Sequence, residues 1–113
     1  MNKSTILKMI SKGESLTVEF KHGSITDISA IYRVMCAFAN SKGGHIILGV
    51  DDNGTIVGCE SKCVDVIKKL INEKHVDDIV SPAITPEITI FDIDSKIISI
   101  RSIHPRLHKN EKT

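Results

Sequence analysis

The 113-residue sequence is poor in aromatic side chains, with three Phe, one Tyr and no Trp. Its core must therefore be mostly aliphatic, and so few stacking rings argue against sequence-specific recognition of single-stranded nucleic acid. No apolar run approaches the length of a transmembrane helix. The P-loop motif Gly-x-x-x-x-Gly-Lys-Ser/Thr is absent as well. We therefore expect one domain with no membrane contact and no ATP site of that kind.

Cysteine is also scarce, and its pattern does not indicate a disulfide framework. The thiols are Cys36, Cys59 and Cys63, an odd number, and no signal peptide precedes them. We therefore expect a reducing, cytoplasmic compartment. Cys59 and Cys63 together with His75 could begin a zinc site, but a fourth ligand at a suitable spacing is missing. Ordinary core or surface thiols are the favoured interpretation.

The net charge of +1 neither favours nor excludes an anionic partner, but the charges are unevenly distributed. Basic residues mark the two ends of the chain, at Lys3, Lys8, Lys12, Arg101, Arg106, Lys109 and Lys112. Basic ends around an acidic middle could form a patch for nucleic acid. The alternative is charge that is simply solvated on the surface of a soluble domain.

Periodicity predicts an alternation of short helices and strands. The expected helices are 4–11 with Ser4 as its cap, a second from Thr26 or Asp27 to about 39, and about 61–74; the expected strands are 16–21, 45–50, 55–57, 87–93 and 96–103. This order predicts an α+β fold, a two-layer α/β sandwich with a mixed, largely antiparallel sheet. We expect the domain to occupy residues 1–103. Residues 104–113 are predicted to be a polar, flexible tail that begins a further C-terminal region.

Two strands of this prediction carry specific expectations. The 16–21 strand alternates strictly, which places Leu16, Val18 and Phe20 on one face and the polar residues on the other. The 45–50 strand is apolar throughout and is therefore expected inside the sheet. Asn53 and Gly54 predict a hairpin turn after it.

Three carboxylates and a lysine make the first candidate site. Glu19 and Lys21 share one face of the 16–21 strand, Glu14 lies on the turn before it, and Asp52 ends a strand that could be its neighbour. Such a set could hold Mg²⁺ or Mn²⁺ in a phosphodiesterase, with the lysine stabilising developing negative charge. The alternative is a weak surface ion pair between Glu19 and Lys21, with ordinary turn chemistry at Asp52.

A second group of candidates is basic and would contact phosphates. Lys42 lies in a loop whose paired glycines expose backbone N–H groups, although such glycines are also typical of a helix C-cap. Arg101, Arg106 and Lys109 lie at the end of the last strand and in the tail, and Lys21 could join them. No cofactor is needed for this kind of binding.

Three segments resemble one known family. GESLTVEFK at 13–21, AFANSKGG at 37–44 and GVDDNGTIVG at 49–58, in this order, are similar to the Schlafen/AlbA-like DNA-binding domain found in bacterial and archaeal regulators and in RecG-like proteins. The resemblance implies a two-layer α/β domain that binds nucleic acid. In the Schlafen proteins the same fold is a metal-dependent RNA endonuclease, and by motif position its three carboxylates would be Glu14, Glu19 and Asp52. Schlafen cores join two such halves in one chain, so a clamp would here need a homodimer.

The preferred interpretation is a DNA-binding domain of a transcriptional regulator that contacts mainly the phosphate backbone. The first alternative is a divalent-metal-dependent endoribonuclease, with Glu14, Glu19 and Asp52 as ligands of Mg²⁺ or Mn²⁺ and Lys21 as an electrophilic helper. The second alternative is a dimerisation or scaffold module, because the last hairpin carries apolar residues on both faces.

Overall fold

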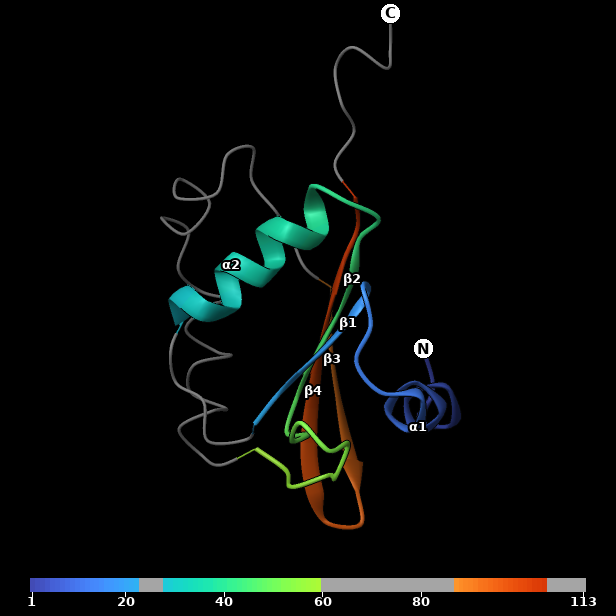
Figure 1. Ribbon diagram of the computed structural model, residues 1–113. Helices are drawn as coiled ribbons and strands as arrows, with labels where there is room; N and C mark the ends of the chain where they lie inside the picture. The colour runs from blue at the N-terminus through green and yellow to red at the C-terminus, as the bar shows by residue number, and fades with distance from the viewer. Residues whose placement is uncertain (23–27, 60–86, 106–113) are drawn as a thin grey trace, which may run out of the picture.

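The structure is a computed structural model that describes residues 1–22, 28–59 and 87–105 (Figure 1). In chain order its elements are α1 (Lys3–Lys12), β1 (Val18–Lys21), α2 (Ile28–Ala39), β2 (Gly44–Leu48), β3 (Glu87–Ile93) and β4 (Lys96–Ile103). The predicted helix at 61–74, the predicted caps Thr26 and Asp27, and the tail from 106 onward lie outside the described residues.

Capping residues define both ends of α1 and the end of α2. The side chain of Asn2 accepts a hydrogen bond of 2.9 Å from the amide three residues on, so Asn2 caps α1, and the predicted cap Ser4 lies inside the helix. Gly13 ends α1 with a φ of 84°, as predicted. Gly43 follows α2 with a φ of 81°, and its amide donates to the Phe38 carbonyl at 2.8 Å. The glycine after α2 is therefore a helix stop.

The described strands form one sheet in the order β1-β2-β4-β3. β1 and β2 are parallel, and the other neighbouring pairs are antiparallel. The α+β class and the mixed, largely antiparallel sheet are thus confirmed. β2 lies inside the sheet, as its apolar sequence predicted, and Ile46, Ile47 and Leu48 are fully buried.

The two helices cover opposite faces of this sheet (Figure 1). Consecutive residues of β2 show the division. Ile46 packs with Met35 and Phe38 of α2, whereas Ile47 packs with Ile6 and Ile10 of α1. The short helix α1 therefore adds a third, partial layer that the two-layer prediction did not include. It is needed because the inner strands are apolar on both faces.

β1 is shorter than the predicted 16–21 strand. Val18 and Phe20 are buried as expected, but Leu16 is 88% exposed, so the predicted inward face is wrong at that residue. Leu16 and Thr17 form a turn, and Ser15 pairs with Val18 across it. The chain thus folds back along the outer edge of β1 instead of extending it.

The predicted strand 55–57 is too long, although the predicted pairing across the turn is present. After β2 the chain makes a single bridge, between Val50 and Ile56, around the turn at Asn53 and Gly54. The β3–β4 hairpin is confirmed, with Ile93 paired to Lys96 at its end. Its turn residues Asp94 and Ser95 have φ values of 51° and 68°, as a two-residue turn of type I′ requires.

Within the described residues, neither helix is long and apolar enough to span a membrane.

Candidate nucleic-acid interface

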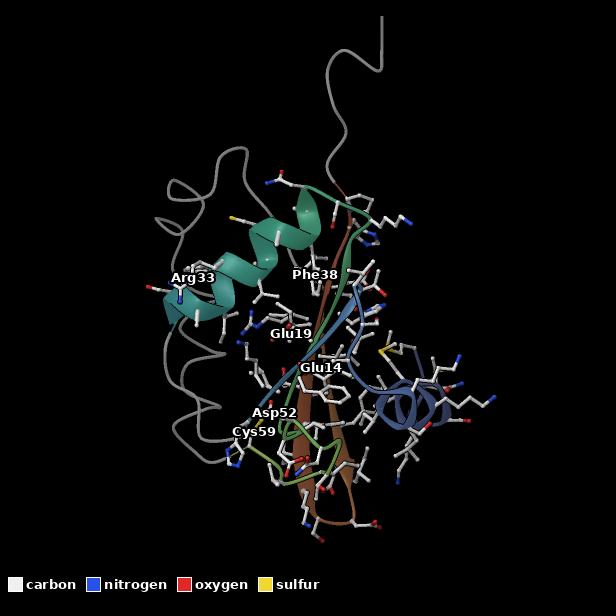
Figure 2. All side chains as sticks on the ribbon, viewed as in Figure 1. Glu14, Glu19, Arg33, Phe38, Asp52 and Cys59 are labelled. Carbon is white, nitrogen blue, oxygen red and sulfur yellow. The ribbon has the colours of Figure 1, made fainter. Side chains whose placement is uncertain are left out.

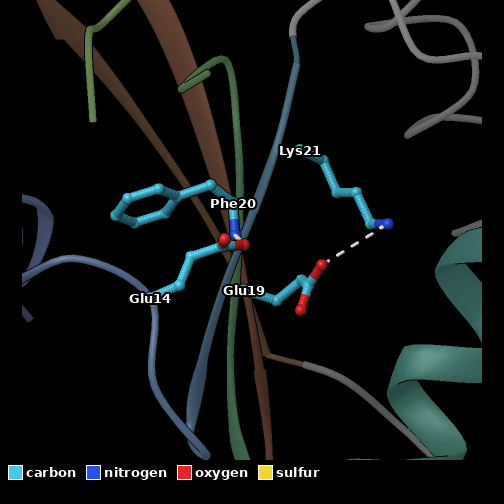
Figure 3. Close-up of polar contacts among 4 residues, drawn as sticks. All are labelled: Glu14, Glu19, Phe20 and Lys21. Carbon is cyan, nitrogen blue, oxygen red and sulfur yellow. Dashed lines mark hydrogen bonds and ion pairs between the residues drawn. The ribbon is translucent and has the colours of Figure 1, made fainter. Parts of the chain in front are cut away.

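The carboxylate of Glu14 caps the outer edge of β1. In β1 the backbone N–H and C=O groups of alternate residues point toward β2. The carbonyls of Thr17 and Lys21 do so, because they accept hydrogen bonds from β2 and from the residues directly after it. The Phe20 amide consequently points away from β2, and it donates to Oε2 of Glu14 at 2.8 Å (Figure 3). Glu14 therefore has a structural role, because it satisfies an amide that no strand pairs.

Glu19 and Lys21 project together from the face of β1 that α2 covers, as the alternation of the strand predicted (Figure 3). Lys21 Nζ lies 3.6 Å from Glu19 Oε2, and the two side chains are 20% and 35% exposed. A pair with this exposure is worth less than about 1 kcal/mol. The pair does shield the Lys21 charge, which makes this lysine a poorer phosphate contact than an exposed one.

Asp51, and not Asp52, holds the turn after β2. Oδ1 of Asp51 accepts from the amides of Asn53 and Thr55, at 3.0 and 2.9 Å. The Asp52 side chain is exposed and makes no hydrogen bond or ion pair in the described part of the chain. The turn chemistry expected of Asp52 therefore belongs to its neighbour.

The three predicted metal ligands, labelled in Figure 2, come from three different segments of the chain. Glu14 is at the outer edge of β1, Glu19 is on the face toward α2, and Asp52 is on the turn that follows β2. Mg²⁺ and Mn²⁺ prefer several converging oxygen ligands. No group of three His, Cys, Asp or Glu side chains that could hold a metal occurs among residues 1–22, 28–59 and 87–105. The donor types suit the ion, and Glu14, Glu19 and Asp52 as its ligands stay a prediction.

Of the predicted phosphate contacts, Arg101 is misplaced. It is 1% exposed, and its neighbours across the sheet are Ile46 and Ile88. Ile46, Arg101 and Ile88 form one row across the sheet face that α2 covers. The guanidinium therefore belongs to the interior of the domain and cannot meet a phosphate on the surface. Lys42 is exposed in the loop after α2. Arg106 and Lys109 lie outside the described residues.

Three of the six exposed lysine and arginine side chains among the described residues lie on α1. Lys3, Lys8 and Lys12 are all exposed, and α1 contains no acidic residue. None of the three forms an ion pair with a residue that the structure describes. The helix is fixed to the sheet by its other side, through Ile6 and Ile10. It thus presents unneutralised ammonium groups to solvent.

A group of polar side chains that the sequence did not single out lies at one end of the sheet. Nδ1 of His45 is 2.8 Å from Oγ of Ser102, and Nε2 of His104 is 3.9 Å from a Glu87 carboxylate oxygen. Burial lowers the pKa of His45, and His104 lowers it further. The strand register reveals this group, because it pairs His45 with Ser102 and Ser102 with Glu87.

Comparisons with known proteins agree with this fold. The family described as Schlafen, AlbA_2 matches residues 14–113. An uncharacterized ATP-binding protein of Ureaplasma parvum is 32% identical over 88 residues, which are 76% of this chain and 25% of that protein. The chain thus spans about a quarter of the length of this relative.

Two solved structures share the fold. The N-terminal domain of a RecG-related protein from Nitrosomonas europaea aligns with a TM-score of 0.63 and 21% identity, over 97% of this chain and 79% of that one. A protein from Corynebacterium diphtheriae aligns with a TM-score of 0.57 and 13% identity, over 93% of this chain and 26% of that one. The family match over nearly the whole sequence shows that the chain belongs to the Schlafen AlbA_2 family.

Proposed function

We propose that this domain binds nucleic acid, with duplex DNA as the first candidate, through the phosphate backbone, as part of a cytoplasmic transcriptional regulator. The observation that carries the proposal is the set of three exposed lysines on α1, which form no ion pair with a described residue. Family membership and the RecG-related neighbour support it. The Ureaplasma relative is described as ATP-binding, but the present chain has no P-loop motif, so we do not extend ATP binding to it.

The mechanism is electrostatic. Each lysine that neutralises a phosphate releases counterions. Each such contact makes the slope of the logarithm of affinity against the logarithm of salt concentration more negative by about 0.9. Three contacts by Lys3, Lys8 and Lys12 would give a slope of about −2.7. Affinity should then fall about 40-fold when salt rises from about 50 to about 200 mM. With no aromatic side chain at this surface, we expect little dependence on base sequence.

Titration of a labelled duplex by fluorescence anisotropy at several salt concentrations tests the proposal. Changing the three lysines of α1 to Gln should abolish most of the salt dependence. The matched control is Lys96→Gln, because Lys96 lies at the hairpin turn and its Nζ donates to the Ile56 carbonyl at 3.3 Å. No binding by the wild type at the lowest salt, or an unchanged slope in the triple variant, would refute the proposal.

The same samples address the other interpretations. We expect light scattering to detect any homodimer, which would double the number of phosphate contacts and the salt slope. Cleavage of a structured RNA in the presence of Mn²⁺ would support the endoribonuclease, especially if Glu19→Gln abolished it. A stable dimer without any binding would support the scaffold module.

A further inference from the structure

On the sheet face that α1 covers, a buried apolar row of side chains is followed, two residues further along the strands, by a row that contains polar side chains. The inner row, made of Phe20, Ile47 and Ile100, is buried with the residues of α1. The row at the end of the same face is made of Val18, His45, Ser102 and Glu87. His104 continues the alternation of β4 beyond Ser102 onto this face. We call His45, Ser102 and His104 the histidine end of the sheet.

The contacts in the histidine end orient its imidazoles. The contact of 2.8 Å between Nδ1 of His45 and Oγ of Ser102 fixes the His45 ring and leaves Nε2 as its second polar atom. His45 is half-buried, and His104 lies close enough to it to lower its pKa. His104 itself is 3.9 Å from Glu87, and both of these side chains are more than three-quarters exposed.

We propose that the histidine end contacts a phosphate of the nucleic-acid backbone, and that this contact strengthens as the pH falls. The inference rests on the proposed function. It adds a second phosphate contact at the end of the sheet where β2 begins, whereas the turn at 51–54 lies at the other end. A protonated imidazole donates charge-assisted hydrogen bonds to phosphate oxygens. Lys42, exposed on the loop three residues before His45, adds a permanent positive charge.

Glu87 determines the sign and the size of the effect. It is the acidic group beside the histidine end, and it repels a phosphate while His104 is neutral. A proton on His104 offsets the charge of Glu87 and leaves the permanent charge of Lys42 to attract the anion. Lowering the pH therefore removes a repulsion. The other described charges of β1 and β3, at Glu19, Lys21 and Asp92, lie on the opposite face of the sheet.

Anisotropy titrations of the full chain with a short DNA duplex, at constant ionic strength between pH 8 and pH 6, test this inference. We expect the wild-type affinity to rise about tenfold as the pH falls, which corresponds to about one added ionic contact. His104→Gln and the double variant with His45→Gln should remove most of this rise. Glu87→Gln should strengthen binding at pH 8 by about three- to tenfold.

Matched controls separate this site from general protonation. His22 follows β1 at the far end of the sheet, so His22→Gln should retain the rise. Asp92→Asn removes an acid from the same strand as Glu87 but from its other face, and it should leave the affinity at pH 8 unchanged. His104 and Glu87 are exposed, so their variants should fold, and circular dichroism checks this.

The outcomes distinguish the two proposals. Salt-dependent binding with the same pH profile in the wild type and in His104→Gln would overturn the histidine end and leave the proposed function intact. No change at pH 8 in Glu87→Gln would also contradict it. Failure of the wild type to bind at any pH and low salt would refute both.

Discussion

Replacing Glu14 by Ala removes the carboxylate oxygen that accepts a hydrogen bond of 2.8 Å from the Phe20 amide. Phe20 is 2% exposed. Its amide would therefore be left without a hydrogen-bond acceptor at the border of the core. A hydrogen bond to a charged acceptor contributes about 1.5–3 kcal/mol, and the exposure of Glu14 places this one at the lower end. We therefore expect Glu14→Ala to lower the free energy of unfolding by about 1–2 kcal/mol.

Glu14→Gln separates the structural role from a catalytic one. The amide oxygen of Gln can still accept from the Phe20 amide, so we expect a loss below about 0.5 kcal/mol. Urea unfolding followed by circular dichroism measures both variants, and the slope m should not change. Glu19→Gln is the control, because its pair with Lys21 is partly exposed and contributes less than about 1 kcal/mol.

Equal destabilisation by Glu14→Gln and Glu14→Ala would contradict this role of Glu14, because the charge and not the acceptor oxygen would then matter. A third result would have a different meaning. If Glu14→Gln kept full stability but abolished a Mn²⁺-dependent RNA cleavage shown by the wild type, Glu14 would be assigned a role in catalysis beyond capping the edge of β1.

Other predictions follow from single positions. Gly43→Ala should cost about 2–3 kcal/mol in thermal or urea unfolding, since the φ of Gly43 is 81° and an added Cβ would lie 2.5 Å from the Ile103 carbonyl oxygen; equal stability would contradict this. Asp51→Ala should cost about 1–2 kcal/mol by losing two hydrogen bonds, whereas Asp52→Ala should stay within about 0.5 kcal/mol. Burial lowers the pKa of His45 below its ordinary value of 6.5, so the unfolded chain binds more protons there. Stability should thus decline as the pH falls below about 6.5 in the absence of nucleic acid, and His45→Gln should reduce the decline measured by urea unfolding.

Local signals in the sequence predicted the ends and turns of the fold well. Gly13 and Gly43 end their helices because a positive φ after a helix is a local requirement that Gly meets most easily. The apolar run of β2 predicted an inner strand. The turn at Asp94 and Ser95 lies between the two predicted strands 87–93 and 96–103, as the sequence indicated. Each of these features depends on a few neighbouring residues.

The errors arise where distant parts of the chain decide the outcome. Leu16 continues the alternation of a strand, yet it lies in a turn because Ser15 pairs with Val18 and Glu14 reaches the edge of β1. Arg101 looks like the start of a basic tail. Its burial follows from the position of β4 between two other strands, which no local pattern reveals. The histidine end depends in the same way on the register between β2, β4 and β3.

The carboxylates implied by the family resemblance differ in how far their structural roles explain them. Glu14 caps an edge strand and Glu19 pairs with Lys21, so both residues have a role in the fold without any metal. Asp52 has none within the described chain, since Asp51 holds the turn. A variant at Asp52 therefore changes little except a function that uses its charge. If the domain binds the phosphate backbone of nucleic acid, loss of this negative charge should leave the affinity unchanged or raise it slightly. If the domain cleaves RNA with a metal ion, the same loss should abolish turnover. Asp52 thus discriminates between the two functions more cleanly than Glu14, whose substitution also perturbs the edge of the sheet.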